Sequence, residues 1–424
     1  MSFSTALSGL NAAANNLAVT GNNIANANTT GFKKSRSEFV DMYATSMAGI
    51  SSLQAGTGVR IAEVAQQFNQ GNRESTENNL DMAISGEGFF TLAKDPTNPK
   101  PDLYTRAGAF MVDKEGYIVN SQGQFLLAYG SKGTPDRISL NTGTSKPVAT
   151  SKIELSLNLK ADSPIPSEPT FSPTAPNSYT YQTPTTIYDS LGASHKLTTY
   201  FVKSSTGDGS WSAHHYITDD PSNPVSIDTG ADNTTSPPTI GTPATLSFDS
   251  TGKLSSTSTG KEIINLAKYK IPGGAAAEIE IEMNYSNATS LASDFNVDSL
   301  KQNGLAAGEL TGINIDPAGV ISAKFSNGQL TPLGQVVLTR FINPQGLTKV
   351  GDTNWAQSIS SGTALTGTAG VGRFGAVLSS ALEQSNVDLS TQLTNLIIAQ
   401  QAYQANAQTI STENQIMQTL LNKL

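Results

Sequence analysis

The sequence predicts a mixed, mainly β fold with helical termini: a nested multidomain chain in which paired, coiled-coil-like terminal helices accompany two β-rich domains. Three observations support this prediction. Apolar residues recur alternately three and four apart at both ends of the chain. Glycine-punctuated segments of strand-like alternation follow inward from each end, and a polar middle rich in Pro, Ser and Thr separates them. The length of 424 residues agrees with about three domains of roughly 150 residues.

The N-terminal end has the pattern of a helix with one packing stripe. Leu7, Leu10, Leu17 and Ile24 belong to an alternation of three and four residues, which is the seam expected of helices that pair. We expect the helix to end near residues 28–31, where turn-forming residues cluster.

The C-terminal end carries a longer stripe of the same kind, which continues to Leu424. Asp388 stands where an N-cap is expected. Polar residues at Gln400 and Asn414 interrupt the stripe, as residues that fix the register of paired helices do. The residues predicted to pack along it are Leu389, Leu393, Leu396, Tyr403, Ile410, Met417 and Leu421.

Each stripe needs a partner, because helices this rich in Asn, Ser and Thr are marginal alone in water. Either each helix packs on its own globular domain, or the two ends pair with each other and with neighbouring subunits. The second alternative is favoured, since no globular sequence lies outside the two helices. In the monomer these ends are then expected to be largely disordered and to fold on assembly.

The inner flanks and the middle read as strands separated by tight turns. In residues 81–92, two glycines precede the apolar pair Phe89-Phe90, and a run of alternating residues such as 197–203 marks the middle. Residues 146–284 are predicted to form a small antiparallel β-domain. The turns share an Asp-x-x-Gly pattern, at 113–116, 189–192, 249–252 and 316–319.

Composition and motifs give no support for catalysis, and we expect no enzyme, no cofactor and no metal. The net charge is −8 without a basic stripe, which disfavours nucleic acid, and there is no Cys. Strand alternation is expected to point the rings of His214 and His215 to opposite faces, which disfavours one metal site. Lys33, Lys34 and Arg36 are interpreted as a solvated turn.

One glycine-rich segment matches a nucleotide-binding pattern by its letters alone. Residues 370–375 read GVGRFG, but no strand precedes them and no acidic residue follows at the usual distance. We interpret the segment as a flexible connector, whose candidate glycines are Gly362, Gly367, Gly370, Gly372 and Gly375.

Three long blocks stand at the ends and inner flanks of the chain: residues 8–33 (SGLNAAANNLAVTGNNIANANTTGFK), residues 81–90 (DMAISGEGFF) and residues 385–424. The first resembles the signature of the axial proteins of the bacterial flagellar rod and hook, the second resembles the next block of that family, and the third is similar to its C-terminal helix. The insertion of about 140 residues makes the hook proteins the most similar members. The signature residues carried over are Asn23, Asn26, Thr30, Gly31, Phe32, Asp81, Gly86, Gly88, Phe89 and Phe90.

The resemblance implies an architecture and a function. A terminal helical polymerisation domain would comprise residues 1–70 with 376–424, a middle β-rich domain 71–145 with 285–375, and an outer β-domain 146–284. The subunit would polymerise into a curved, hollow tube that transmits motor torque to the filament as a universal joint. Its implied partners are further copies of itself, the distal rod protein, the hook cap, the hook–filament junction proteins and the flagellar export apparatus.

The implied location is the flagellar hook and basal body, outside the cell. Residues 1–17 lack the basic and apolar regions of a cleaved secretory signal, so type III export is expected, with no membrane insertion. The competing hypotheses are a distal rod protein with an insertion and a cell-surface adhesin whose Thr-rich β-domain binds glycans. Straight polymers would indicate the first, and sugar affinity of residues 146–284 the second.

Overall fold

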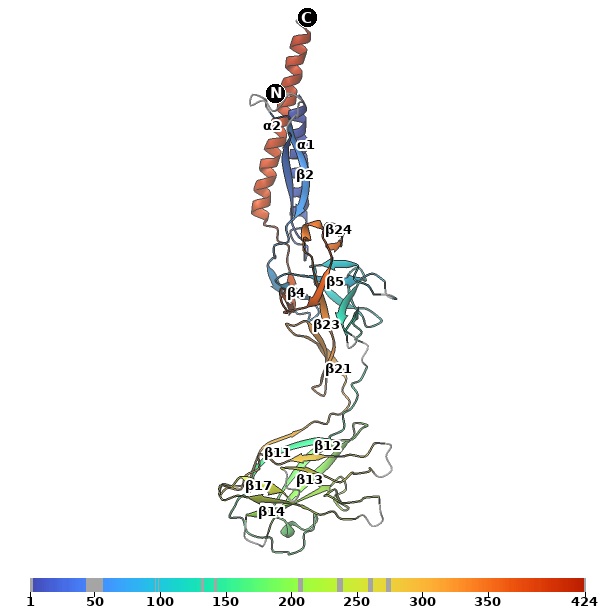
Figure 1. Ribbon diagram of the computed structural model, residues 1–424, viewed down its shortest axis with the longest axis vertical. Helices are drawn as coiled ribbons and strands as arrows, with labels where there is room; N and C mark the ends of the chain where they lie inside the picture. The colour runs from blue at the N-terminus through green and yellow to red at the C-terminus, as the bar shows by residue number, and fades with distance from the viewer. Residues whose placement is uncertain are drawn as a thin grey trace. The chain divides into compact units, whose positions relative to one another are not determined.

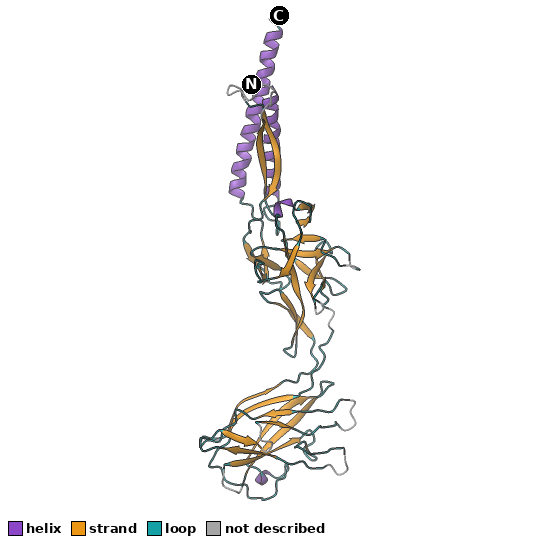
Figure 2. Cartoon of the chain, in the orientation of Figure 1, coloured by secondary structure: helices purple, strands orange, loops and turns teal. Residues whose placement is uncertain are grey.

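The computed structural model describes residues 3–42, 56–95, 97, 99–130, 133–140, 143–204, 209–234, 239–257, 262–271 and 276–422. The outermost residues of the predicted helical domain, including Leu424, lie outside these ranges, as do residues 43–55. The chain folds into two compact units, one of residues 1–142, 312–324 and 330–424 and the other of residues 143–311 and 325–329. Figure 2 confirms the predicted fold class, since strands predominate and the helices lie at the termini. A division of the first unit into a helical and a β-rich domain stays a prediction.

The two terminal helices of the first unit lie side by side (Figure 1). They are α1 (Phe3–Ala25) and α2 (Leu389–Leu421). They run antiparallel, because Gly9 approaches Asn406 whereas Asn23, further along α1, donates to Gln392, earlier in α2. An antiparallel hairpin of β1 (Ser35–Met42) and β2 (Gly58–Gln66) packs along α1.

One predicted helix boundary is confirmed and the other is displaced. The helix α1 ends at Ala25, before the predicted residues 28–31, which lie in the turn that follows. Asp388 caps α2, because its Oδ1 accepts a hydrogen bond from the backbone N–H of Thr391 at 2.7 Å.

The β-rich part of the first unit combines strands from both halves of the chain. The strands are β3 (Arg73–Ser75), β4 (Met82–Ser85), β5 (Phe89–Ala93), β6 (Leu103–Thr105), β7 (Phe110–Val112), β8 (Ile118–Asn120), β9 (Phe125–Tyr129), β10 (Pro135–Arg137), β21 (Leu310–Ile315), β22 (Val320–Phe325), β23 (Leu330–Arg340), β24 (Thr348–Gly351), β25 (Asn354–Ala356), β26 (Leu365–Thr368), β27 (Ala376–Ser379) and β28 (Ala381–Glu383). The largest sheet has the order β21-β22-β23-β9-β5-β6-β25-β24. Smaller antiparallel pairs join β27 to β4 and β28 to β3.

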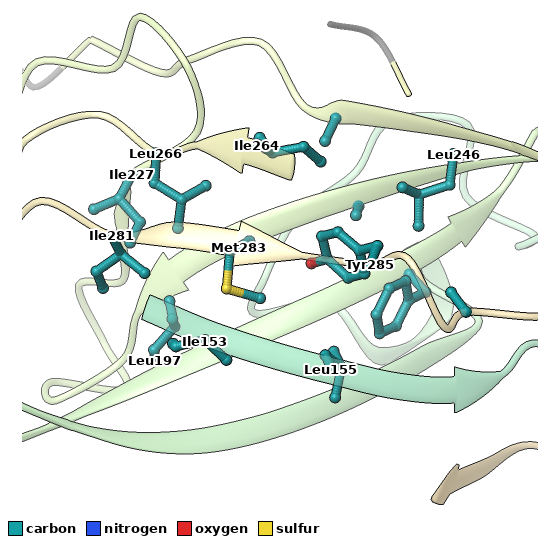
Figure 3. Packing of buried hydrophobic residues seen from close by; sticks show 14 of the residues in the cluster. Ile153, Leu155, Leu197, Ile227, Leu246, Ile264, Leu266, Ile281, Met283 and Tyr285 are labelled. Atoms are coloured by element: carbon teal, nitrogen blue, oxygen red, sulfur yellow. The ribbon is translucent and has the colours of Figure 1, made fainter. Parts of the chain in front are cut away.

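The second unit packs two sheets on one apolar core. Its strands are β11 (Lys152–Asn158), β12 (Tyr181–Tyr188), β13 (Ser194–Lys203), β14 (Ser210–Ile217), β15 (Val225–Ser226), β16 (Ala244–Phe248), β17 (Leu254–Thr257), β18 (Ile263–Asn265), β19 (Glu282–Asn284) and β20 (Asn296–Gln302). One sheet has the order β18-β19-β11-β20 and the other β12-β13-β14-β16-β17. Figure 3 shows Ile153, Leu197, Met283 and Tyr285 meeting between them.

All four Asp-x-x-Gly turns are confirmed, and they share one geometry. The glycines have φ of 86° at Gly116, 87° at Gly192, 79° at Gly252 and 75° at Gly319. In each turn the Asp carbonyl accepts from the glycine N–H, and the Asp Oδ1 accepts from the N–H of the residue after the glycine. The carboxylate therefore fixes the turn while glycine supplies the left-handed backbone.

Candidate functional site

The contact between α1 and α2 is made by small side chains. The buried residues of the two helices, among those described, are Ala6, Ala13, Thr20 and Asn23 on α1 and Gln392 and Ala399 on α2, and all except Asn23 are spaced seven apart on their helix. A Cβ added at Gly9 would lie 2.6 Å from Asn406 Oδ1, so the two helices approach closely here. The seam therefore buries little apolar area and leaves the larger apolar side chains elsewhere.

The predicted packing residues divide into two groups. Leu10, Leu17, Ile24, Leu396 and Ile410 are partly buried in the first unit. The others are exposed: Leu7, Leu389, Leu393, Tyr403, Met417 and Leu421. Whether they pack against neighbouring subunits stays a prediction.

Further large apolar side chains of α2 are exposed on other sides of the helix. Ile397 is 54% exposed, Ile398 56% and Ile416 54%. At about 100° per residue, Leu393 and Ile398 point about 140° apart. We call Leu389, Leu393, Ile397, Ile398, Tyr403, Ile416, Met417 and Leu421 the exposed apolar set of α2. A helix that is apolar on several sides is typical of one surrounded by other protein.

A buried ionic cluster lies where the helical pair meets the strands. Lys33 Nζ is 2.5 Å from Glu383 Oε1, and Arg106 Nη1 is 3.2 Å from Glu383 Oε2. The Lys33 and Glu383 side chains are fully buried, and Arg106 nearly so. Burial lowers the pKa of both Lys33 and Arg106, while the attraction of Glu383 opposes this effect. We call these three residues the Glu383 cluster.

Backbone groups complete the Glu383 cluster. Glu383 Oε1 also accepts from Gly71 N at 2.9 Å, and Lys33 Nζ donates to Asn69 O at 2.9 Å. Arg106 Nη2 donates to Gly86 O at 2.7 Å. The cluster thus joins the segment after α1, the β2–β3 connection, the β4–β5 turn and the C-terminal strand β28.

Two asparagines continue this network to the helices. Asn23, 2% exposed, accepts from Ser35 N and donates to Ser35 O and Gln392 Oε1. Asn386 accepts from Lys34 N and donates to Gln67 O. Both ends of the chain are therefore anchored to the same strands.

The interpretation of the basic residues after α1 as a solvated turn is wrong for Lys33. The position of Lys33 directly after the Gly31-Phe32 signature was the one sign in the sequence that this lysine is special. Its acidic partner could not be recognised, because Glu383 lies 350 residues away in sequence. Arg36 is exposed and paired with Glu38, as expected of a surface residue. Nothing in the sequence pointed to Arg106 or Glu383.

The family signature residues from distant blocks converge on this junction. Gly31, with φ of 69°, donates to Glu383 O at 2.7 Å. Asn26 and Thr30 lie in the turn after α1, and Phe32 is buried. Asp81 accepts from Ala381 N, and Gly86 accepts from Arg106. Gly88 has φ of 127°, Phe89 packs on Trp355 and Phe90 on Phe110.

The candidate connector glycines differ in their surroundings. Gly370 and Gly372 have positive φ and nothing within 4 Å of an added Cβ, and Gly362 is nearly as open. Gly367 lies in β26 against the Phe374 ring, and a Cβ at Gly375 would meet Ser85 O at 2.5 Å. The connector role stays a prediction. Because Gly367 and Gly375 are tightly packed, the remaining candidates for it are Gly362, Gly370 and Gly372.

Two of the three histidines of the second unit pack in or beside its core. His215 is fully buried; its Nδ1 lies 2.7 Å from Asp228 Oδ1 and its Nε2 2.7 Å from Tyr285 Oη. His214 stacks on Phe171 with centroids 3.9 Å apart. Within the described ranges, no group of three His, Asp or Glu side chains has the geometry to hold a metal. Nor does either described helix contain an apolar stretch long enough to cross a membrane.

Family descriptions match most of the chain in order. "Flagella basal body rod protein" matches residues 3–33 and "Flagellar hook protein FlgE/F/G D1 domain" residues 83–156. "Flagellar basal body protein FlaE D2 domain" matches residues 157–305, and "Flagellar basal body rod FlgEFG protein C-terminal" residues 378–424.

Full-length relatives agree with these matches. The chain is 39% identical to the flagellar hook protein FlgE of Salmonella typhimurium over 432 residues, covering all of both chains. It is also 39% identical to FlgE of Escherichia coli K12 over 431 residues, again covering all of both. The crystal structure of Helicobacter pylori FlgE2 shares the fold, with a TM-score of 0.52 and 18% identity over 73% of this chain and all of that one.

Proposed function

The chain belongs to the flagellar hook protein family, and from this premise we propose how its termini assemble. It is a structural subunit of the bacterial flagellar hook, located in the hook and basal body. We propose that it polymerises helically into a hollow tube in which α1 and α2 form the inner layer. Such a head-to-tail, non-closing contact generates a filament.

The exposed apolar set of α2 carries this proposal. Small residues make the contact with α1, so Leu393, Ile397 and Ile398 are left uncovered on different sides of one helix. Covering them with neighbouring copies removes apolar surface from water, worth about 1.5–3 kcal/mol for each fully buried side chain. Because these side chains lie on several sides of α2, several neighbouring copies are needed to cover them, and a helical polymer provides these neighbours.

The test compares Ile397→Asp with Ile240→Asp in the full chain. Ile397 is 54% exposed on α2, and Ile240 is 72% exposed in the second unit, so the same substitution is made at two open sites. After salting out, electron microscopy should show curved tubes for wild type and Ile240→Asp. Ile397→Asp should need a concentration at least about a hundredfold higher, because assembly buries the carboxylate.

The fold of the variants is checked by thermal unfolding, which should match wild type. Circular dichroism should show more helix in tubes than in monomers, because the terminal helices gain partners on assembly. Tubes of Ile397→Asp at the wild-type concentration would contradict the proposal. So would a wild type that forms no tubes while its terminal helices are folded.

The torque-transmitting role requires movement between parts of the subunit. We propose that Gly362, Gly370 and Gly372 permit this movement. These glycines have positive φ and few or no neighbouring atoms, so no side-chain contact hinders rotation of their backbone. In the same curved tubes, residues 362–375 should differ in backbone conformation between the inside and outside of the bend. One conformation all round the tube would exclude these glycines as the joint.

The finer partners and the route of the subunit follow from the family. We propose contacts with the distal rod protein, the hook cap and the hook–filament junction proteins, and export through the flagellar type III apparatus. We also propose that the subunit has no enzymatic activity, in keeping with a structural family. Straight tubes would instead favour a rod-like role.

A further inference from the structure

A pocket of about 630 Å³ lies in the first unit beside the Glu383 cluster. Its walls are the turn after α1, the β8–β9 connection and the β24–β25 hairpin, which Figure 1 marks by the label β24. The volume falls within the roughly 300–1,000 Å³ of typical ligand pockets. Asn and Thr side chains make much of the lining, and the family signature residues Asn26, Thr30 and Phe32 belong to it.

Two buried polar atoms of residues that line this pocket have no partner. Asn354 Nδ2 donates to Gln124 Oε1 at 3.0 Å, but Asn354 Oδ1 accepts no hydrogen bond. The indole Nε1–H of Trp355 donates none. Asn354 is 3% exposed and Trp355 1% exposed, so both atoms have lost water without replacement. Asn354 and Trp355 are consecutive in β25, so their side chains leave opposite faces of the strand, and the indole shares its face with Lys349, its partner across the hairpin. A buried donor without an acceptor is what an incoming acceptor group satisfies.

A cation without a carboxylate partner lines the same pocket. Lys349 is exposed as a whole, but its Nζ lies 5.5 Å from the centroid of the Phe32 ring and 3.4 Å from Ser35 Oγ. Burial lowers the pKa of Lys349, and no acidic group offsets that effect. Asp352, the carboxylate in the lining, is exposed and forms no ion pair with Lys349.

The rim of the pocket has a strained backbone. Gly351, Asp352 and Thr353 are consecutive and have φ of 104°, 50° and 57°. Thr105 Oγ1 donates to Thr353 O at 2.9 Å and holds this turn in place. Non-glycine residues adopt such conformations at a cost, and proteins concentrate that cost at binding sites.

We propose that this pocket binds a carboxylate, as an acidic residue in an extended segment of a second copy presents it. The carboxylate would accept from Lys349 Nζ and Trp355 Nε1, which lie on the same face of the β24–β25 hairpin. The chain carries 34 acidic residues against 26 basic ones, so carboxylates abound on neighbouring copies. The source in a second copy rests on the proposed helical assembly.

The test follows the indole N–H of Trp355 by nitrogen-15 NMR. The chain has two tryptophans, and Trp211, buried in the core of the second unit, is the internal reference. Monomers are titrated in solution with sodium acetate and with N-acetyl-aspartate N-methylamide. Assembled tubes are measured by solid-state NMR. Because the indole gains an acceptor, its signal should move downfield on assembly while that of Trp211 stays.

The matched variants are Lys349→Met and Lys100→Met. Lys100 is exposed in the same unit and lies outside the pocket. Lys349→Met should raise the concentration needed for assembly on the order of tenfold and abolish the indole shift, because a charge-assisted hydrogen bond is lost. It should not lower the unfolding temperature of the monomer, whereas a structural lysine would.

The outcomes of these experiments distinguish a carboxylate of a neighbouring copy from a free carboxylate in solution. A shift on assembly alone assigns the pocket to a carboxylate of a neighbouring copy, and a saturable shift of the monomer with either probe assigns it to a free carboxylate. Tubes without an indole shift, and no shift with the probes, overturn the inference while leaving the assembly proposal intact. If the wild type forms no tubes, the assembly proposal is refuted. The titrations with acetate and N-acetyl-aspartate N-methylamide then decide by themselves whether the pocket binds a carboxylate.

Discussion

Replacing Glu383 by Gln should destabilise the first unit by about 3–5 kcal/mol. The side chains of Lys33 and Glu383 are 0% exposed and that of Arg106 6%, so the substitution leaves two buried cations without their anion. Glutamine keeps the size of the side chain and an oxygen that can accept from Gly71 N. The loss of stability therefore measures the effect of removing the negative charge, because the shape of the side chain is unchanged.

Urea and thermal unfolding of the full chain measure this effect. A loss of that size should lower the melting temperature of the first unit by on the order of 10 °C. The second unit has its own core and should unfold as in wild type. The control is Glu87→Gln: Glu87 pairs with Arg340 at 2.8 Å, but its side chain is 55% exposed, so the expected loss is at most about 1 kcal/mol.

Equal, small losses for Glu383→Gln and Glu87→Gln would refute the reasoning, since they would mean that the buried cations find other compensation. The double variant Lys33→Met/Glu383→Gln adds a second check. Methionine removes one of the two unpaired cations, so the double variant should be more stable than Glu383→Gln alone.

Two further predictions concern a glycine and a histidine. Gly31→Ala should cost clearly more than Gly123→Ala in urea unfolding: both have positive φ, worth roughly 1–2 kcal/mol, but only a Cβ at Gly31 would overlap the backbone of Ala107. Equal losses would contradict this. Burial lowers the pKa of His214 from 6.5 to about 4, so the unfolded chain binds a proton that the folded unit excludes between these values. The second unit should lose up to about 3 kcal/mol as pH falls from 6.5 to 4, and His214→Gln should lack this loss; equal pH profiles would contradict it.

Local chemistry explains what the sequence predicted well. Asp388 caps a helix and the Asp-x-x-Gly turns form because each signal acts within four residues of itself. The strand around Phe89 and Phe90 follows from alternation and from the glycines before it. Such signals do not depend on which distant segment completes the fold.

The buried residues of α2 differ from several that periodicity selected. Periodicity placed Leu393, Gln400 and Asn414 on the seam, whereas Gln392 and Ala399 are buried and Gln392 accepts a hydrogen bond from Asn23 of α1. Hydrophobic patterns give weight to large side chains, but close antiparallel contact needs small ones. The large side chains mark surface left free in one subunit, and under the proposed assembly the pattern would report a contact between copies.

The Glu383 cluster escaped prediction for another reason. Ion pairing of Lys33 with Glu383 joins residues 350 apart in sequence, and its strength comes from burial that only the assembled sheets create. From sequence, a lysine in a turn beside another basic residue has the pattern of a solvated position. Pairings of this kind become visible only when the two halves of the chain are brought together by β3–β28 and β4–β27.

The energetics of the helical pair support the proposal that its folding depends on neighbours. Ordering each residue costs about 1–2 kcal/mol of backbone entropy, and two long helices must be ordered. The apolar residues fully buried between or beside them are few and small, such as Ala6, Ala13 and Ala399, and each returns less than a buried Leu or Ile would. The Glu383 cluster lies next to the end of the pair where α1 ends and α2 begins. Further along the pair, from Asn23 towards the N-terminus of α1, the helices are held together by a narrow seam. In the proposed tube, burial of Leu393 and Ile397 by other copies would supply further stabilisation, so assembly and helix formation would be one event.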